Sequence, residues 1–165
     1  MRKAEIRIGG FYTDGRQGLR EVIEEGSHLN TYGAVNPDCV RYRVHTSGKL
    51  PDVGTESNMT RTGFATWADE EVPAADVAEF KQFHLAQRIE ARLTTLQRNF
   101  LETFEVFTGP GTLVKCPREE FRVATALKDK GLISTIPSRL EPRQSEFQVE
   151  LSDLGEKVLR CVQGR

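Results

Sequence analysis

Cysteine is scarce in this chain, and its spacing suits neither a disulfide framework nor a zinc site. The three cysteines, Cys39, Cys116 and Cys161, are odd in number and far apart, and none belongs to a C-x-x-C pair. The three histidines are equally scattered, without metal-ligand or triad spacing. We therefore expect reduced, mostly buried thiols, no metal and no cofactor.

Long apolar runs and catalytic signatures are also missing. No run approaches the ~20 apolar residues that span a bilayer, and the N-terminal segment lacks a signal-peptide core. The phosphate-binding P-loop, the serine-hydrolase elbow and the His-Glu-x-x-His motif are all absent. These absences predict a cytoplasmic protein that is not an enzyme and has no membrane partner.

Neither sign of charge is in excess. Lys and Arg number 23 against 24 Asp and Glu, which gives a formal net charge of −1. This balance argues against a strongly basic nucleic-acid binder and equally against an acidic mimic of DNA. A length of 165 residues fits one ordinary domain or two small ones, and the pattern along the chain favours two small units.

Residues 1–72 are predicted to form a small β domain. Val40, Tyr42 and Val44 alternate with polar residues in the clearest half-buried strand of the chain. Further short strands are expected at 6–8, 19–25 and 59–67, separated by turns rich in glycine. Short strands of this kind predict a small antiparallel barrel or a curled sheet, because that geometry protects the strand edges.

Residues 4–70 resemble the small SH3-like barrels of bacterial and phage proteins. The resemblance rests on four short segments, Gly10-Phe11-Tyr12, Arg20 to Ile23, Val40 to Val44 and Phe64 to Trp67. It implies a barrel of a kind that binds peptides, nucleic acids or nothing.

A long amphipathic helix is predicted over residues 73–107. Its apolar residues recur at steps of three and four and form one stripe, made of Leu85, Ile89, Leu93, Leu96, Phe100, Phe104 and Phe107. A helix of this length exceeds the usual ~10–14 residues, so either it breaks near 84–88 or it pairs with another chain. The stripe is therefore either core or the seam of a homodimer through residues 77–107.

Residues 108–165 are predicted to form a second small domain. A strand at 112–115 is followed by a helix from Pro117 that ends at Gly131. Strands at 133–136 and 147–151 flank a polar loop, and Ser152 then caps the last helix. The predicted fold class is therefore α+β: an N-terminal β domain, a long linking helix and a C-terminal helix-and-hairpin unit.

Residues 93–162 resemble winged-helix proteins of the MarR and PadR type. The matching residues are Leu127, the Lys130-Gly131-Leu132-Ile133 turn, the loop 138–145 and the helix start Leu151-Ser152-Asp153-Leu154-Gly155. The resemblance implies DNA binding, with the helix before the turn in the major groove and the hairpin, or wing, on the minor groove or phosphates. It points to one set of contact residues: Arg118, Arg122, Thr125, Lys128, Arg139 and Arg143.

The chain departs from that family in one respect. Residues 107–117 have room for a strand but not for the helix that normally precedes the reading helix. Glu119 and Glu120 at the start of the reading helix would also face phosphates unfavourably. Each basic cluster therefore keeps two interpretations. Arg139 and Arg143 either form a solvated hairpin tip or bind phosphates. Arg118 and Arg122 either belong to a plain helix surface or contact bases.

The strand face that carries Arg41, Arg43 and His45 also keeps two interpretations. It is either the ordinary polar face of a sheet or a surface that follows a nucleic-acid backbone.

Two functions are consistent with these features. One is a non-catalytic adaptor or inhibitor, of the kind found among phages and mobile elements, that binds a protein or a nucleoprotein complex. The other is a small dimeric transcriptional regulator that binds duplex DNA.

Overall fold

The computed structural model describes residues 1–26, 30–31, 34–35, 38–104 and 111–164. The chain divides into two compact units, Met1–Lys81 and Gln82–Arg165. Both combine helices with antiparallel sheets, so the predicted α+β class is confirmed.

The N-terminal unit contains an open five-stranded antiparallel sheet. Its order is β6 (Glu56–Thr60), β5 (Cys39–Thr46), β2 (Leu19–Glu25), β1 (Phe11–Thr13) and β7 (Glu70–Val72). The two outer strands, β6 and β7, do not pair with each other, so the sheet is open. Of the two predicted forms, a barrel or a curled sheet, the closed barrel is therefore wrong. The strands predicted at 19–25 and around Val40 to Val44 are confirmed as β2 and β5.

The expected strand at 59–67 is mostly a helix, α1 (Arg61–Trp67). The hydroxyl of Thr60 accepts the backbone N–H of Gly63 at 3.0 Å and caps this helix. One face of α1 buries Phe64 and Ala65. The threonines and aromatic residues that suggested a strand therefore serve as a cap and a buried helical face.

The remaining N-terminal elements are short. The predicted strand at 6–8 is not formed: a 3₁₀ turn, η1 (Lys3–Glu5), precedes Ile6, which is buried, and Ile8 is 59% exposed. β3 (Asn30–Thr31) pairs with β4 (Ala34–Val35), and η2 (Leu50–Asp52) lies in the loop between β5 and β6.

Two apolar clusters stabilise the N-terminal sheet. In the larger one, Phe64 of α1 packs its ring against those of Tyr12 and Tyr42, at centroid distances of 5.5 and 5.7 Å. The smaller one joins Leu19 and Val72 of the sheet to the first turn of helix α2 (Val77–Glu90).

The linking region is not a single helix. α2 is followed by a break at 91–94 and then by α3 (Thr95–Glu102), so the break lies later than the predicted 84–88. Thr94 starts α3: its hydroxyl accepts the N–H of Gln97, whose side chain accepts the N–H of Thr94 in return.

Most of the predicted apolar stripe packs into the C-terminal core. Phe100 and Phe104 are buried, and Ile89 and Leu93 pack against the same cluster. Leu85 and Leu96 stay 45% and 69% exposed, and Phe107 lies outside the described residues.

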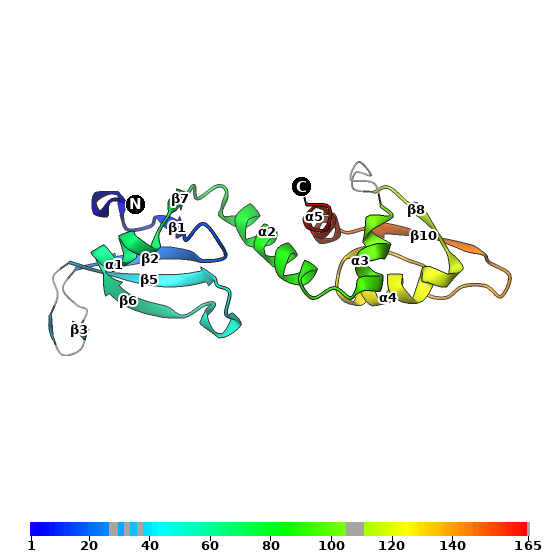
Figure 1. The fold of residues 1–165 in the computed structure, drawn as a ribbon, viewed down its shortest axis with the longest axis horizontal. Helices are drawn as coiled ribbons and strands as arrows, with labels where there is room; N and C mark the ends of the chain where they lie inside the picture. The colour runs from blue at the N-terminus through cyan, green and yellow to red at the C-terminus, as the bar shows by residue number, and fades with distance from the viewer. Residues whose placement is uncertain (27–29, 32–33, 36–37, 105–110, 165) are drawn as a thin grey trace. The chain divides into compact units, whose positions relative to one another are not determined.

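The C-terminal unit is built on a three-stranded antiparallel sheet in the order β8 (Val114–Pro117), β10 (Glu146–Leu151) and β9 (Ile133–Thr135). A 3₁₀ turn, η3 (Arg118–Glu120), leads from β8 into α4 (Phe121–Asp129), so α4 begins a few residues later than predicted from Pro117. Figure 1 shows α3, α4 and α5 (Asp153–Val162) gathered beside this sheet, with the loop before β10 projecting beyond them.

The last helix docks on the turn that ends α4. Gly131 closes α4 with φ +75°, which favours glycine. Ser152 anchors the start of α5 to this turn: its hydroxyl donates to the Gly131 carbonyl at 2.6 Å and accepts the N–H of Gly155 at 3.0 Å, and its N–H bonds to the Leu132 carbonyl at 3.0 Å. The predicted caps at Gly131 and Ser152 are confirmed.

Candidate functional site

Three predicted contact residues lie on α4. Arg122 and Lys128 are exposed and make no ion pair within the described part of the chain. The hydroxyl of Thr125 donates to the carbonyl of Phe121 at 2.8 Å, one helical turn back. Thr125 therefore uses its donor inside the helix, whereas the two cations are available to a partner.

Arg118 has a structural partner in the hairpin loop. Its guanidinium donates to the carbonyls of Glu141 and Gln144, both at 2.8 Å, and its backbone N–H donates to the carbonyl of Ser145 at 2.8 Å. These bonds tie the start of the helical segment to the loop that precedes β10. The structure thus uses Arg118 to shape the hairpin, a role that its sequence position did not suggest.

Arg139 and Arg143 lie on that hairpin loop. Both are exposed, and neither forms an ion pair within the residues that the structure describes. The same loop also exposes Glu141 and, at its end, Glu146. The local surface is therefore of mixed charge rather than uniformly basic.

The basic face of β5 is neutralised by carboxylates on its neighbouring strands. Arg41 pairs with Glu56 at 2.7 Å and Glu24 at 3.7 Å. Arg43 pairs with Glu56 at 2.8 Å and Glu21 at 3.7 Å. The cross-strand register produces this ladder, because Glu24 lies opposite Arg41, while Glu21 and Glu56 flank Arg43.

The ladder also affects protonation. The hydrogen bonds that Arg43 donates to Glu56 hold the pKa of Glu56 below its ordinary value and raise the pKa of Arg43. Both groups are therefore charged at neutral pH. A phosphate that bound these two arginines would have to compete with the carboxylates that already pair with them.

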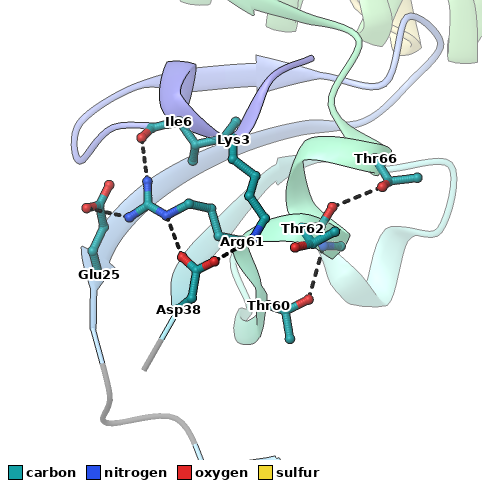
Figure 2. Close-up of polar contacts among 9 residues, drawn as sticks. Lys3, Ile6, Glu25, Asp38, Thr60, Arg61, Thr62 and Thr66 are labelled. Carbon is teal, nitrogen blue, oxygen red and sulfur yellow. Dashed lines mark hydrogen bonds and ion pairs between the residues drawn. The ribbon is translucent and has the colours of Figure 1, made fainter. Parts of the chain in front are cut away.

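Arg61 holds the start of α1 in place. Figure 2 shows its guanidinium between Glu25, Asp38 and the backbone of Ile6. It pairs with Glu25 at 2.6 Å and Asp38 at 3.0 Å, and donates to the Ile6 carbonyl at 2.8 Å. Lys3 also reaches Asp38 at 2.7 Å, and this hydrogen bond is the main cause of the lowered pKa of Asp38.

A surface that sequence reasoning missed lies on the outer face of the C-terminal sheet. Alternation along β10 turns Phe147, Val149 and Leu151 into the core and leaves Glu146 and Gln148 exposed. An open groove of about 450 Å³ lies over this face, and its lining residues combine apolar and polar groups: Leu113, Lys115, Thr135, Pro137, Gln144, Glu146, Phe147 and Gln148.

The sequence gave little indication of this groove, for two reasons. Its polar residues look like any solvent-facing strand positions, and Leu113, 49% exposed, precedes a strand as an apolar residue usually does. Lys115 lies directly opposite Gln148 across the β8–β10 pair. The groove therefore offers apolar contacts surrounded by side chains that both donate and accept hydrogen bonds.

The described residues contain no cluster of histidine, cysteine, aspartate or glutamate arranged to hold a metal ion. None of their helices has the length and apolar character needed to cross a bilayer.

Comparison with known protein families, with curated proteins and with solved structures gives no match.

Proposed function

We propose that this chain is a non-catalytic interaction protein whose C-terminal unit is a winged-helix variant that binds a protein or a nucleoprotein complex. Two features support the winged-helix interpretation. The strand order in the sheet is β8-β10-β9, and along the chain α3 precedes β8, α4 lies between β8 and β9, and α5 follows β10. Between β8 and β9, only η3 and α4 occur. The helix that precedes the reading helix in the MarR type has no counterpart there.

One observation carries the choice of a protein partner: the groove on the outer sheet face. Apolar contacts from Leu113 and Pro137 lie beside Lys115, Glu146 and Gln148. Apolar contact area bordered by hydrogen-bonding groups is the usual composition of a protein interface. No helix of the described C-terminal unit covers this face, since α3, α4 and α5 pack with the core on the other side.

The charges favour the same choice. Arg41 and Arg43 are paired with carboxylates, and Arg118 is bonded to the hairpin backbone. Three of the residues considered for nucleic-acid contact are thus already engaged. An affinity that depends on neutralising phosphates has correspondingly fewer cations to use.

The experiment compares partner capture by three tagged proteins from host lysate: the wild type, a groove variant and a matched control. The groove variant, Leu113→Glu with Gln148→Glu, places carboxylates in the groove without touching the core. The control, Val53→Glu, changes an apolar residue that is 41% exposed in the N-terminal unit. We expect a stoichiometric partner with the wild type and the control, and its loss with the groove variant. Equal capture by all three, or no stoichiometric partner at all, contradicts the proposal.

A dimeric DNA-binding regulator is the second candidate, and the unpaired cations of α4 and the hairpin favour it. Arg122, Lys128, Arg139 and Arg143 all lack ion pairs among the described residues. Affinity for duplex DNA should then fall steeply with added salt, and Arg139→Ala with Arg143→Ala should weaken it on any sequence. Fluorescence anisotropy that detects no binding at low salt excludes this candidate.

The homodimer predicted through residues 77–107 belongs to the second candidate. The exposed Leu85 and Leu96 support it. Light scattering at high protein concentration tests it, and a monomer mass there would exclude a stable dimer.

A further inference from the structure

The N-terminal unit holds an arginine between two aromatic rings. The guanidinium of Arg20 lies 3.9 Å from the ring centroid of Trp67 and 4.5 Å from that of Tyr42. Such stacking fixes the plane of the guanidinium by cation–π attraction and leaves its edges open to hydrogen bonds. Trp67 ends α1, whereas Arg20 and Tyr42 come from the neighbouring strands β2 and β5.

Arg20 has no carboxylate partner at ion-pair distance among the described residues. Among those same residues, its side chain makes one hydrogen bond, to the sulfur of Met59 at 3.8 Å, and sulfur is a weak acceptor. Burial lowers the pKa of Arg20, but a guanidinium stays protonated. A partly buried cation with so few acceptors is costly, and an anionic ligand would relieve that cost.

Arg20 lines a pocket of about 270 Å³ near the end of α1. The pocket also contains Asp14, Asp52 and the hydroxyl of Ser57. Gly18 lets Trp67 and Asp14 pack closely at the pocket, because a Cβ at that position would lie 2.8 Å from both the Trp67 ring and the Asp14 carboxylate. The pocket is smaller than the ~300–1,000 Å³ typical of drug-sized ligands, so its ligand is small.

Several pocket groups are already hydrogen-bonded. One carboxylate oxygen of Asp14 accepts the N–H groups of Arg16 and Gly18, at 3.0 and 2.8 Å. The hydroxyl of Thr46 donates to the Gln17 carbonyl at 2.7 Å. The Asp52 carboxylate accepts the hydroxyl of Ser47 at 3.3 Å. The groups with hydrogen-bonding capacity left include the Arg20 N–H groups and acceptor oxygens on Asp14 and Asp52. The pocket lining therefore combines one cation with two carboxylates, which suits a small ligand that carries both charges.

We propose that this pocket binds a small zwitterion of the α-amino acid class, with its carboxylate on Arg20 and its ammonium group on the side of Asp14 and Asp52. A planar guanidinium matches a carboxylate with two parallel hydrogen bonds. The two aspartates oppose a phosphate dianion, because like charges at close range repel. They attract an ammonium group for the same reason. This site lies in the N-terminal unit and is separate from the groove of the C-terminal unit.

The test uses the full-length chain and its only tryptophan. Because Trp67 is the single tryptophan of the sequence and lines the pocket, its fluorescence reports binding there directly. Each of the twenty amino acids is titrated in turn. Sodium acetate and inorganic phosphate serve as probes that carry negative charge but no ammonium group. Tryptophan and tyrosine are followed by calorimetry, because they fluoresce themselves. We expect a saturable signal with at least one amino acid, at lower concentration than with either probe.

Three variants separate binding from folding. Arg20→Gln should weaken the best amino acid at least about tenfold, since it removes a charge-assisted pair. Arg16→Gln changes an exposed arginine in the turn between β1 and β2, and this variant should bind the amino acid as the wild type does. Asp52→Asn should weaken the amino acid but not acetate, and because Asp52 is exposed this variant still tests the proposal if Arg20→Gln fails to fold.

The proposal is overturned by any of three results. One is the absence of saturable binding by every amino acid. Another is phosphate or acetate binding more tightly than all of them. The third is unchanged affinity in a folded Arg20→Gln variant or in Asp52→Asn.

Discussion

Replacing Gly155 by alanine should destabilise the C-terminal unit, although alanine is the better helix former. Gly155 lies in the first turn of α5, where the helix crosses the backbone of Leu132. A Cβ at this position would lie 3.0 Å from the Leu132 carbonyl carbon and closer still to its oxygen. The obstacle is backbone, which cannot move aside as a flexible side chain can.

The magnitude follows from what the helix must give up. Moving the start of α5 to a normal contact distance costs about 1–3 kcal/mol for overpacking. The shift also strains the Ser152 cap, worth about 1 kcal/mol, while the gain in helix propensity from glycine to alanine returns about 1 kcal/mol. We therefore expect the free energy of unfolding of the C-terminal unit to fall by about 2 kcal/mol.

Urea unfolding followed by circular dichroism at 222 nm measures this change. Trp67 fluorescence in the same samples reports the N-terminal unit and should keep its midpoint. Arg160→Ala, at an exposed position of the same helix, is the matched control and should change stability by less than about 0.5 kcal/mol. A Gly155→Ala protein as stable as the wild type, or more stable, would refute the steric argument.

Three further predictions concern charge, the hairpin and a thiol. Folding lowers the pKa values of Glu56 and Asp38 from their ordinary values of 4.5 and 3.8. The two carboxylates therefore stabilise the folded N-terminal unit at a pH above these ordinary values, and this stabilisation is lost as the pH falls through the lowered pKa values. Urea midpoints from Trp67 fluorescence should therefore stay level from pH 7 to about 5 and drop below that, and Glu56→Gln should flatten the drop; an equal drop in this variant contradicts the assignment. Arg118→Ala removes two hydrogen bonds to the hairpin, at a cost of about 1 kcal/mol. Amide hydrogen exchange in residues 139–145 should therefore become faster, and an unchanged exchange rate counts against this role of Arg118. Burial raises the pKa of the Cys116 thiol to about 11. Iodoacetamide at pH 8 should therefore modify this thiol only after unfolding, which peptide mass spectrometry measures. Rapid labelling of Cys116 in the folded protein would contradict its burial.

The sequence predicted best where local chemistry decides the structure. Alternation identified β5, since a half-buried strand turns its apolar side chains to one face. The glycine turns that precede residues 19–25 indicated β2. Gly131 and Ser152 were found because their roles as caps depend on backbone conformation and a nearby hydroxyl.

It failed where the same residues suit two structures. The segment 59–67 is rich in threonine and aromatic residues, which favour strands, but Thr60 acts as a helix cap and Phe64 packs from a helix. Tertiary packing decided between the two, and no pattern within the segment contains that information. The break after α2 was placed too early for a similar reason, because the apolar stripe continues across it.

The candidate contact residues were found by type, but their partners were not predictable. Arg41 and Arg43 share a strand face as expected, yet only the register of β5 against β2 and β6 shows that glutamates neutralise them. Arg118 bonds to carbonyls more than twenty positions along the chain. Contacts at such separations depend on the fold as a whole.

The outer strands of the two larger sheets affect how copies of this protein behave when they are concentrated. A strand with unpaired backbone groups is a template for pairing with another chain, and continued pairing leads to fibres. Here β7 carries Glu70 and Glu71, β6 begins with Glu56, β9 is short and β8 ends in Pro117, which has no N–H to donate. Charged side chains, a short strand and a missing amide make these edges poor templates for edge-to-edge pairing between copies.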